Sequence, residues 1–308
     1  MRRLFNRGNP DAQVFLELGA DHIAWAVTGN GAWPRCGSCA MPPDNPAETL
    51  RDLVDRQGWK GAPATLVLPM DQYQVFQLDR PDGLEDGELA DGVKWRLRDF
   101  LDYPPSEAVC DVFPLPANAS RGQGRQINVV AAHKARLQNP IALIDRCGLR
   151  MRAIEVAELA LRNLAAALDD GGRGVALVHL REHYGQLVIC RGGSLYLSRR
   201  LEVSSAALRD ETLQGQAVQG LALEIQRSMD YYESQLGQVP PASIQLLAED
   251  AGLSLADRLS ANMTLAVVAP DWARLGVDPV PGSHCVLPWS AALGEPDTAA
   301  SLPGEQAA

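Results

Sequence analysis

One segment of the chain repeats the outline of another, and this duplication constrains the fold more than any other feature. Residues 175–203 have the pattern of three strands joined by two turns, and residues 191–194 form the second turn. Residues 14–28 have the same outline, a strand, a tight turn containing Gly19 and a second strand, and residues 29–31 supply the next turn. Long amphipathic helical stretches follow both copies, so the sequence predicts two similar α/β units.

Composition limits the classes of partner. The 308 residues are 46% hydrophobic and 21% charged, which is enough to bury a core and suits two domains better than one. The formal net charge is −10 and the isoelectric point is near 5.0. A field of that sign repels phosphate, so we expect no nucleic-acid partner and no broad attraction to an anionic membrane.

The sequence predicts a cytoplasmic protein. The basic start of the chain runs into Asn9-Pro10 without the apolar stretch of a secretory signal. No apolar run reaches the length that spans a bilayer, so membrane association is expected to come through partners. The six cysteines do not form a dense disulfide pattern, and we expect free thiols.

The order of expected elements divides the chain. We expect residues 1–70 and 149–172 to form a first half, residues 71–148 to interrupt it as an inserted subdomain, and residues 173–292 to form a second half. Residues 293–308 lack an apolar pattern and are expected to be a disordered tail.

Two details of the insertion are predicted from local signals. Apolar spacing predicts a helix over residues 88–101, and Trp95 and Phe100 are interpreted as core residues rather than as a recognition surface. Asn139 followed by Pro140 predicts a helix that starts there, with an asparagine cap and proline in the first helical position.

Five stretches, taken together in their order and spacing, carry a resemblance. They are FLELGADHIAWAV, LVLPMDQYQVFQLDRP, VKWRLRDFLDYPPSEAVCDVFPL, INVVAAHKARLQNPIALIDRCGLRMRAIEVAELAL and EIQRSMDYYESQLG. The chain up to about Ala292 resembles the actin-like ATPase fold and, within it, the PilM-like family of pilus-assembly proteins, especially the branch that serves mannose-sensitive haemagglutinin (MSHA) pili. The resemblance implies an α/β, ribonuclease H-like duplicated fold with an inserted α+β subdomain.

The resemblance also implies a role. Such proteins are cytoplasmic adaptors that lie at the inner membrane through their partners. The expected partner is the cytoplasmic N-terminal peptide of a bitopic inner-membrane pilus protein, taken up beside the insertion, and the assembly ATPase is a second expected contact. Capture of an extended peptide at a sheet edge or in a groove is physically reasonable.

In an actin-like fold, ATP and Mg²⁺ lie between the halves, where turns rich in glycine and small hydroxyl side chains approach the phosphates. In the first loop of this chain Glu17 keeps a carboxylate and Gly19 keeps the close approach, but Ala20 replaces the hydroxyl and Asp21 adds negative charge. We expect this loop to be a degenerate phosphate site.

The second loop departs further from the pattern. It carries His179, Arg181 and His183 and lacks both aspartate and glycine, while the turn that ends at Gly252 contains two carboxylates. Either the three basic side chains form an alternative anion site or they cap an exposed turn, and we favour the second interpretation. We therefore expect no cofactor, no metal and no ATP hydrolysis.

Two hypotheses of other classes stay open. One is an active actin-fold ATP-binding protein or ATPase that drives assembly. The other is a thiol-redox protein that uses Cys36 and Cys39, which have the spacing of a redox pair. Against it, these cysteines follow a hairpin turn and do not open a helix, so we interpret them as small residues on an edge strand.

Overall fold

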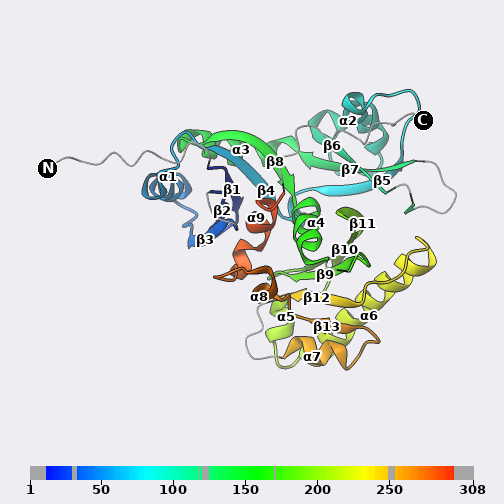
Figure 1. Ribbon diagram of the computed structural model, residues 1–308. Coiled ribbons are helices and arrows are strands. Elements are labelled where there is room, and N and C mark those ends of the chain that lie inside the picture. Colours follow the sequence, from blue (N-terminus) through cyan, green and yellow to red (C-terminus); the bar gives the residue numbers. More distant parts are fainter. Residues whose placement is uncertain are drawn as a thin grey trace.

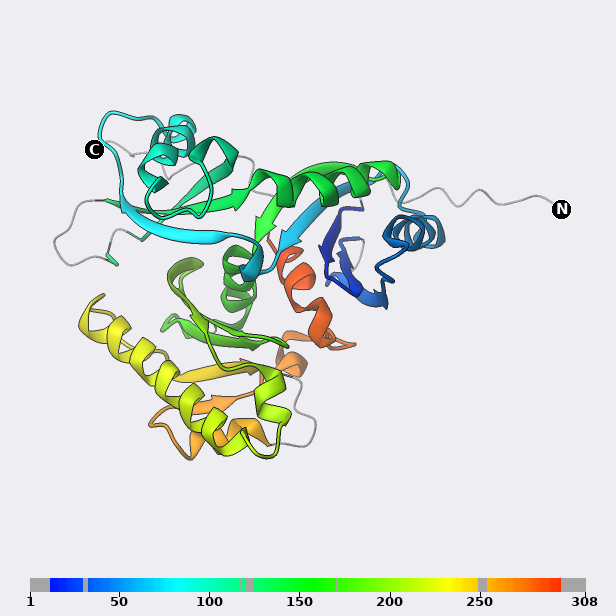
Figure 2. The same cartoon turned by 180° about the vertical axis from the view of Figure 1, so that it is seen from behind.

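The computed structural model describes residues 12–29, 33–116, 118–119, 125–169, 171–248 and 254–294. These residues form two large sheets and one small sheet, with helices packed between and around them (Figures 1 and 2). The turn that contains Gly252 lies outside the described residues, as does the expected tail from residue 295 onward.

The first large sheet has the strand order β3-β2-β1-β4-β8. Its strands are β1 (Val14–Leu18), β2 (His22–Val27), β3 (Arg35–Ala40), β4 (Pro63–Leu68) and β8 (Arg150–Val156). The strands β1, β2 and β3 form an antiparallel meander, and β4 and β8 run parallel to β1.

The second large sheet repeats this arrangement in the order β11-β10-β9-β12-β13. Its strands are β9 (Val175–Leu180), β10 (Gly185–Arg191), β11 (Ser194–Leu201), β12 (Ser243–Leu247) and β13 (Ala266–Val268). Again three strands form an antiparallel meander and two strands follow in parallel. The identical connectivity confirms the duplicated α/β architecture.

The helices connect and cover the sheets. They are α1 (Pro46–Gln57), α2 (Asp86–Lys94), α3 (Lys134–Arg146), α4 (Ala157–Leu168), α5 (Ser205–Arg209), α6 (Gln214–Ser234), α7 (Leu255–Ser260), α8 (Trp272–Leu275) and α9 (Val286–Ala291). Helix α4 lies between the large sheets and contacts strands of both, as Figure 1 shows. Because its apolar residues face both ways, one buried cluster continues from the first sheet through α4 into the second.

The end of the described chain returns to the first sheet. Helix α9 packs beside α4 on the face formed by β1, β2, β3 and β4. The indole nitrogen of Trp289 donates a hydrogen bond to the carbonyl of Pro34 at 3.0 Å, and its ring stacks on Trp33. The second half of the chain is thereby anchored to the first by its C-terminal helix.

The third sheet, in the order β5-β7-β6, is formed by the insertion, and helix α2 packs on it, whereas α3 also packs on β8 of the first sheet (Figure 1). Its strands are β5 (Gln74–Asp79), β6 (Ala108–Pro114) and β7 (Gln126–His133). Both strand pairs are antiparallel. Because β7 is the central strand, β5 and β6 are the two edges of this sheet.

Two expectations for the insertion are wrong. Helix α2 stops at Lys94 and a 3₁₀ turn follows, so Leu97 turns inward, while Trp95 is 61% and Phe100 57% exposed. Helix α3 starts at Lys134, where the ring nitrogen Nδ1 of His133 accepts a hydrogen bond from the backbone of Ala135. Pro140 lies inside that helix and does not start it.

None of the helices in the described ranges combines the length and the hydropathy needed to cross a lipid bilayer.

Candidate functional site

The turn after β1 is closed by His22, whose ring fills the space beside Gly19. The backbone N–H of Gly19 donates to the carbonyl of His22 at 2.9 Å, and a Cβ on Gly19 would lie 2.4 Å from the His22 ring. Ala20 and Asp21 are exposed at the tip. The hydrogen bond and charge of His22 lower the pKa of Asp21, so that carboxyl stays ionised and adds negative charge to the turn.

Glu17 and Arg181 form an ion pair that joins the two large sheets. Glu17 is buried near the end of β1, and the guanidinium of Arg181, from the turn after β9, binds both of its carboxylate oxygens. The Nη1–Oε2 distance is 3.2 Å, and Nη2 contacts Oε1. Burial lowers the pKa of Arg181, but the charge of Glu17 and its hydrogen bonds raise it by more, so the pKa of Arg181 is raised overall.

The histidines of the second loop have different surroundings. His179 is buried on β9, and burial, followed by the charge of Arg181, lowers its pKa to about 3, so the ring is neutral. Its Nδ1 has no hydrogen-bond partner among the described residues. His183 is exposed at the tip of the turn. The structure thus brings Glu17, Arg181 and His179 together and leaves His183 outside this group.

This arrangement does not fit a nucleotide and its metal. The carboxylate of Glu17 is held by Arg181, so it is not free to organise Mg²⁺ or its waters. The donors of Arg181 that a phosphate would use are directed at Glu17. Within the described ranges, no three His, Cys, Asp or Glu side chains are grouped as metal ligands would be.

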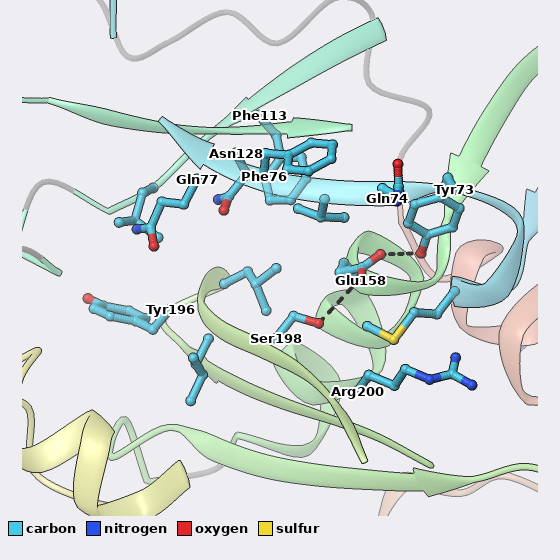
Figure 3. A pocket seen from close by; sticks show the side chains of 15 residues that line it. Tyr73, Gln74, Phe76, Gln77, Phe113, Asn128, Glu158, Tyr196, Ser198 and Arg200 are labelled. Atoms are coloured by element: carbon cyan, nitrogen blue, oxygen red, sulfur yellow. Dashed lines mark hydrogen bonds between the residues drawn. The ribbon is translucent and has the colours of Figure 1, made fainter. Parts of the chain in front are cut away.

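A cavity of about 440 Å³ lies between β5 of the insertion and β11 of the second sheet (Figure 3). Glu158, fully buried at the start of α4, lines it. Its carboxylate accepts hydrogen bonds from the hydroxyls of Tyr73 and Ser198, and the Tyr73 oxygen accepts from the N–H of Ala157 at 3.0 Å. Burial raises the pKa of Glu158 and, more strongly, that of Tyr73. The network joins the insertion, α4 and the second sheet.

A second, more apolar groove of about 380 Å³ lies between β6 of the insertion and β8 of the first sheet. Both strands are sheet edges. Val109 on β6 is 44% exposed and Ile154 on β8 is 37% exposed, although both are large and apolar. Buried or half-buried apolar residues form the floor, namely Leu68, Val130, Leu137, Ile141, Val156 and Leu159.

The sequence reasoning placed partner binding beside the insertion but named no residue of this groove. The sequence of β8 could have indicated an edge strand. A parallel strand in the interior of a sheet is nearly all apolar, whereas Arg150–Val156 contains two arginines and a glutamate. An amphipathic pattern of that kind is typical of an edge strand.

No family model and no curated protein sequence matches the chain. A structure described as the PilM-PilN type IV pilus biogenesis complex aligns with a TM-score of 0.66 at 20% identity, covering 91% of this chain and 96% of that one.

Two further solved structures align over most of their length. The cytoplasmic domain of EpsL, an inner-membrane component of the type II secretion system of Vibrio cholerae, gives a TM-score of 0.52 at 11% identity, covering 92% of this chain and 96% of that one. A Bacteroides thetaiotaomicron protein of unknown function with an actin-like ATPase fold gives 0.53 at 8% identity, covering 87% and 97%. This chain has the actin-like ATPase fold. Strands β1 and β9 are the equivalent first strands of its two duplicated sheets.

Proposed function

We propose that this chain is a non-catalytic, actin-like adaptor of type IV pilus assembly, of the MshI kind that serves MSHA pili. Its ligand is the cytoplasmic N-terminal peptide of a bitopic inner-membrane pilus protein. The groove between β6 and β8 is the observation that carries this proposal. The likeness in fold to the structure of the PilM-PilN complex supports the choice of partner class.

The groove suits an extended peptide for two reasons. Each flanking strand is the edge of its sheet, so backbone groups along it lack a sheet partner on one side. An added strand uses those groups for hydrogen bonds, and pockets for alternate side chains supply the selectivity. Val109 and Ile154 stand on opposite walls of the groove and offer apolar contacts to such side chains.

The surroundings of Glu17 support the non-catalytic part of the proposal. The ion pair between Glu17 and Arg181 occupies the groups that a phosphate and its metal would need. We therefore assign the working surface to the insertion, residues 71–148, and its junction with β8. The peptide holds the adaptor at the inner membrane, where a further face contacts the assembly ATPase.

Titration of labelled peptides, taken from the cytoplasmic tails of inner-membrane pilus proteins, tests the assignment by fluorescence anisotropy. Ile154→Asp and Val109→Asp place a charge in the groove, and we expect each to weaken binding of the cognate peptide at least about tenfold. Val268→Asp is the matched control, because Val268 is 38% exposed on β13, an edge strand of the other large sheet. Equal binding by all four proteins, or loss in the control alone, contradicts the groove.

A further inference from the structure

The cysteines of β3 face opposite sides of the first sheet. Cys36 pairs with Ala26 and Cys39 with Ile23 in the register of β2 and β3. Side chains three positions apart on a strand point to opposite faces, and their Cα atoms are about 10 Å apart. A disulfide requires Cα atoms within about 7 Å, so Cys36 and Cys39 cannot join without breaking the strand.

Cys36 faces another cysteine instead. The 3₁₀ turn η4 (Ser283–Cys285) leads into α9 and packs against β2 and β3 on the face that α9 covers. Cys285 lies beside Cys36 there, where its thiol can donate a hydrogen bond to a Cys36 thiolate. Cys36 is half-buried at the sheet edge, whereas Cys285 is buried. The chain thus holds two free thiols as neighbours, one accessible and one protected.

The two thiols differ in readiness to react. The hydrogen bond from Cys285 lowers the pKa of Cys36, because it stabilises the thiolate. The same bond and burial raise the pKa of Cys285. An accessible thiol with a lowered pKa next to a protected thiol is the arrangement of an attacking cysteine and a resolving cysteine.

We propose that Cys36 and Cys285 form a reversible disulfide, which fastens the C-terminal η4–α9 segment to the edge strand β3. The oxidant is a low-molecular-weight disulfide. The Cys36 thiolate attacks one of its sulfurs, forms a mixed disulfide and releases one thiolate. Deprotonated Cys285 then attacks Cys36 Sγ, closes the intrachain bond and releases the second thiolate. Two protein thiols are oxidised, one small disulfide is reduced to two thiols, and the two protons go to the released thiolates.

The bond would also act on the turn after β1. His284, the neighbour of Cys285, packs its ring against His22 with centroids 4.3 Å apart. The backbone carbonyl of His22 accepts a hydrogen bond from the N–H of Gly19, which closes the turn after β1. Oxidation therefore fixes the C-terminal segment against the same turn that follows Glu17.

The Cys36–Cys285 disulfide can be tested by oxidising the full chain with 2-hydroxyethyl disulfide and mapping its peptides by mass spectrometry without reduction. Cys36 and Cys39 fall in one tryptic peptide, so the mapping uses the variants Cys36→Ser and Cys39→Ser. We expect wild type and Cys39→Ser to link residue 36 to residue 285 and Cys36→Ser to remain unlinked. The linked forms should unfold about 3–10 °C higher, and dithiothreitol should reverse the rise.

Several results would overturn the pair. They are a link that persists in Cys36→Ser, a link between Cys36 and Cys39, or a mixed disulfide on Cys36 that never proceeds to Cys285. Because Cys285 is buried and its replacement could disturb folding, the decision rests on the two β3 variants, whose thermal midpoints before oxidation should equal that of wild type within about 2 °C.

Discussion

The carboxylate of Glu17 on β1 binds the guanidinium of Arg181 after β9, so a single ion pair joins equivalent ends of the two duplicated sheets. In an actin-like fold this is the region where a nucleotide bridges the halves. Here a side chain of the second half performs the bridging. The tie is formed by two side chains of the chain itself.

Removing one member of this pair should be costly. Arg181→Met leaves the buried carboxylate of Glu17 without its partner, and we expect unfolding free energy to fall by about 3–5 kcal/mol. The double variant Glu17→Gln/Arg181→Met buries no charge and should recover most of that loss. Urea denaturation measures both. A double variant as unstable as Arg181→Met would show that the arginine acts through packing and not through the charge of Glu17.

Nucleotide binding should be absent at ordinary concentrations. Because Glu17 and Arg181 satisfy each other, we expect isothermal titration of Mg-ATP to give no heat that fits a micromolar site. The opposite result, micromolar Mg²⁺-dependent binding with turnover that disappears in Glu17→Ala, would replace the adaptor with an active ATPase. Asp21→Ala is the control, because its carboxylate is exposed and unpaired with Arg181.

The network at Glu158 predicts a pH-dependent loss. Tyr73→Phe removes a hydroxyl that donates to the buried carboxylate and accepts from Ala157, and should cost about 1–3 kcal/mol. The Tyr73 hydrogen bond lowers the pKa of Glu158 against the effect of burial. Without it the charged form is less stable, so the loss should grow as pH rises through the pKa of Glu158.

Chemical denaturation between pH 5 and pH 8 measures this trend. In a Glu158→Gln background the extra cost of Tyr73→Phe should no longer depend on pH, because position 158 then carries no titratable group. A cost that is constant with pH in both backgrounds would assign the effect to packing alone.

The duplicated meanders could be predicted because they depend on local information. Alternating apolar residues and glycine turns give the strands of both copies, and strand connectivity then follows from chain order. The start of α3 was misplaced because Asn139-Pro140 has the local chemistry of a helix start, whereas the true cap, His133, is a residue that sequence rules rank low.

The contacts of the site could not be predicted in the same way. Arg181 reaches Glu17 from 164 positions away, and Cys285 reaches Cys36 only because the chain returns to the first sheet at α9. Contacts between residues so far apart in the sequence leave no periodic pattern in it. The spacing of Cys36 and Cys39 suggested a pair, but the strand that contains them places the two thiols on opposite faces.

His179 provides a test by acid. Its pKa in the folded chain is about 3, well below the ordinary value near 6.5, so the unfolded chain binds a proton more readily. Stability from this residue is therefore complete above about pH 6.5 and is lost as pH falls toward 3. The slope from one such site is at most about 1.4 kcal/mol per pH unit.

His179→Gln should flatten the acid limb of the stability profile between pH 6.5 and 5, whereas His183→Gln, at the exposed tip of the same turn, should leave it unchanged. Urea midpoints across this range measure the slope, and equal slopes in wild type and His179→Gln would mean that the buried ring is protonated without penalty.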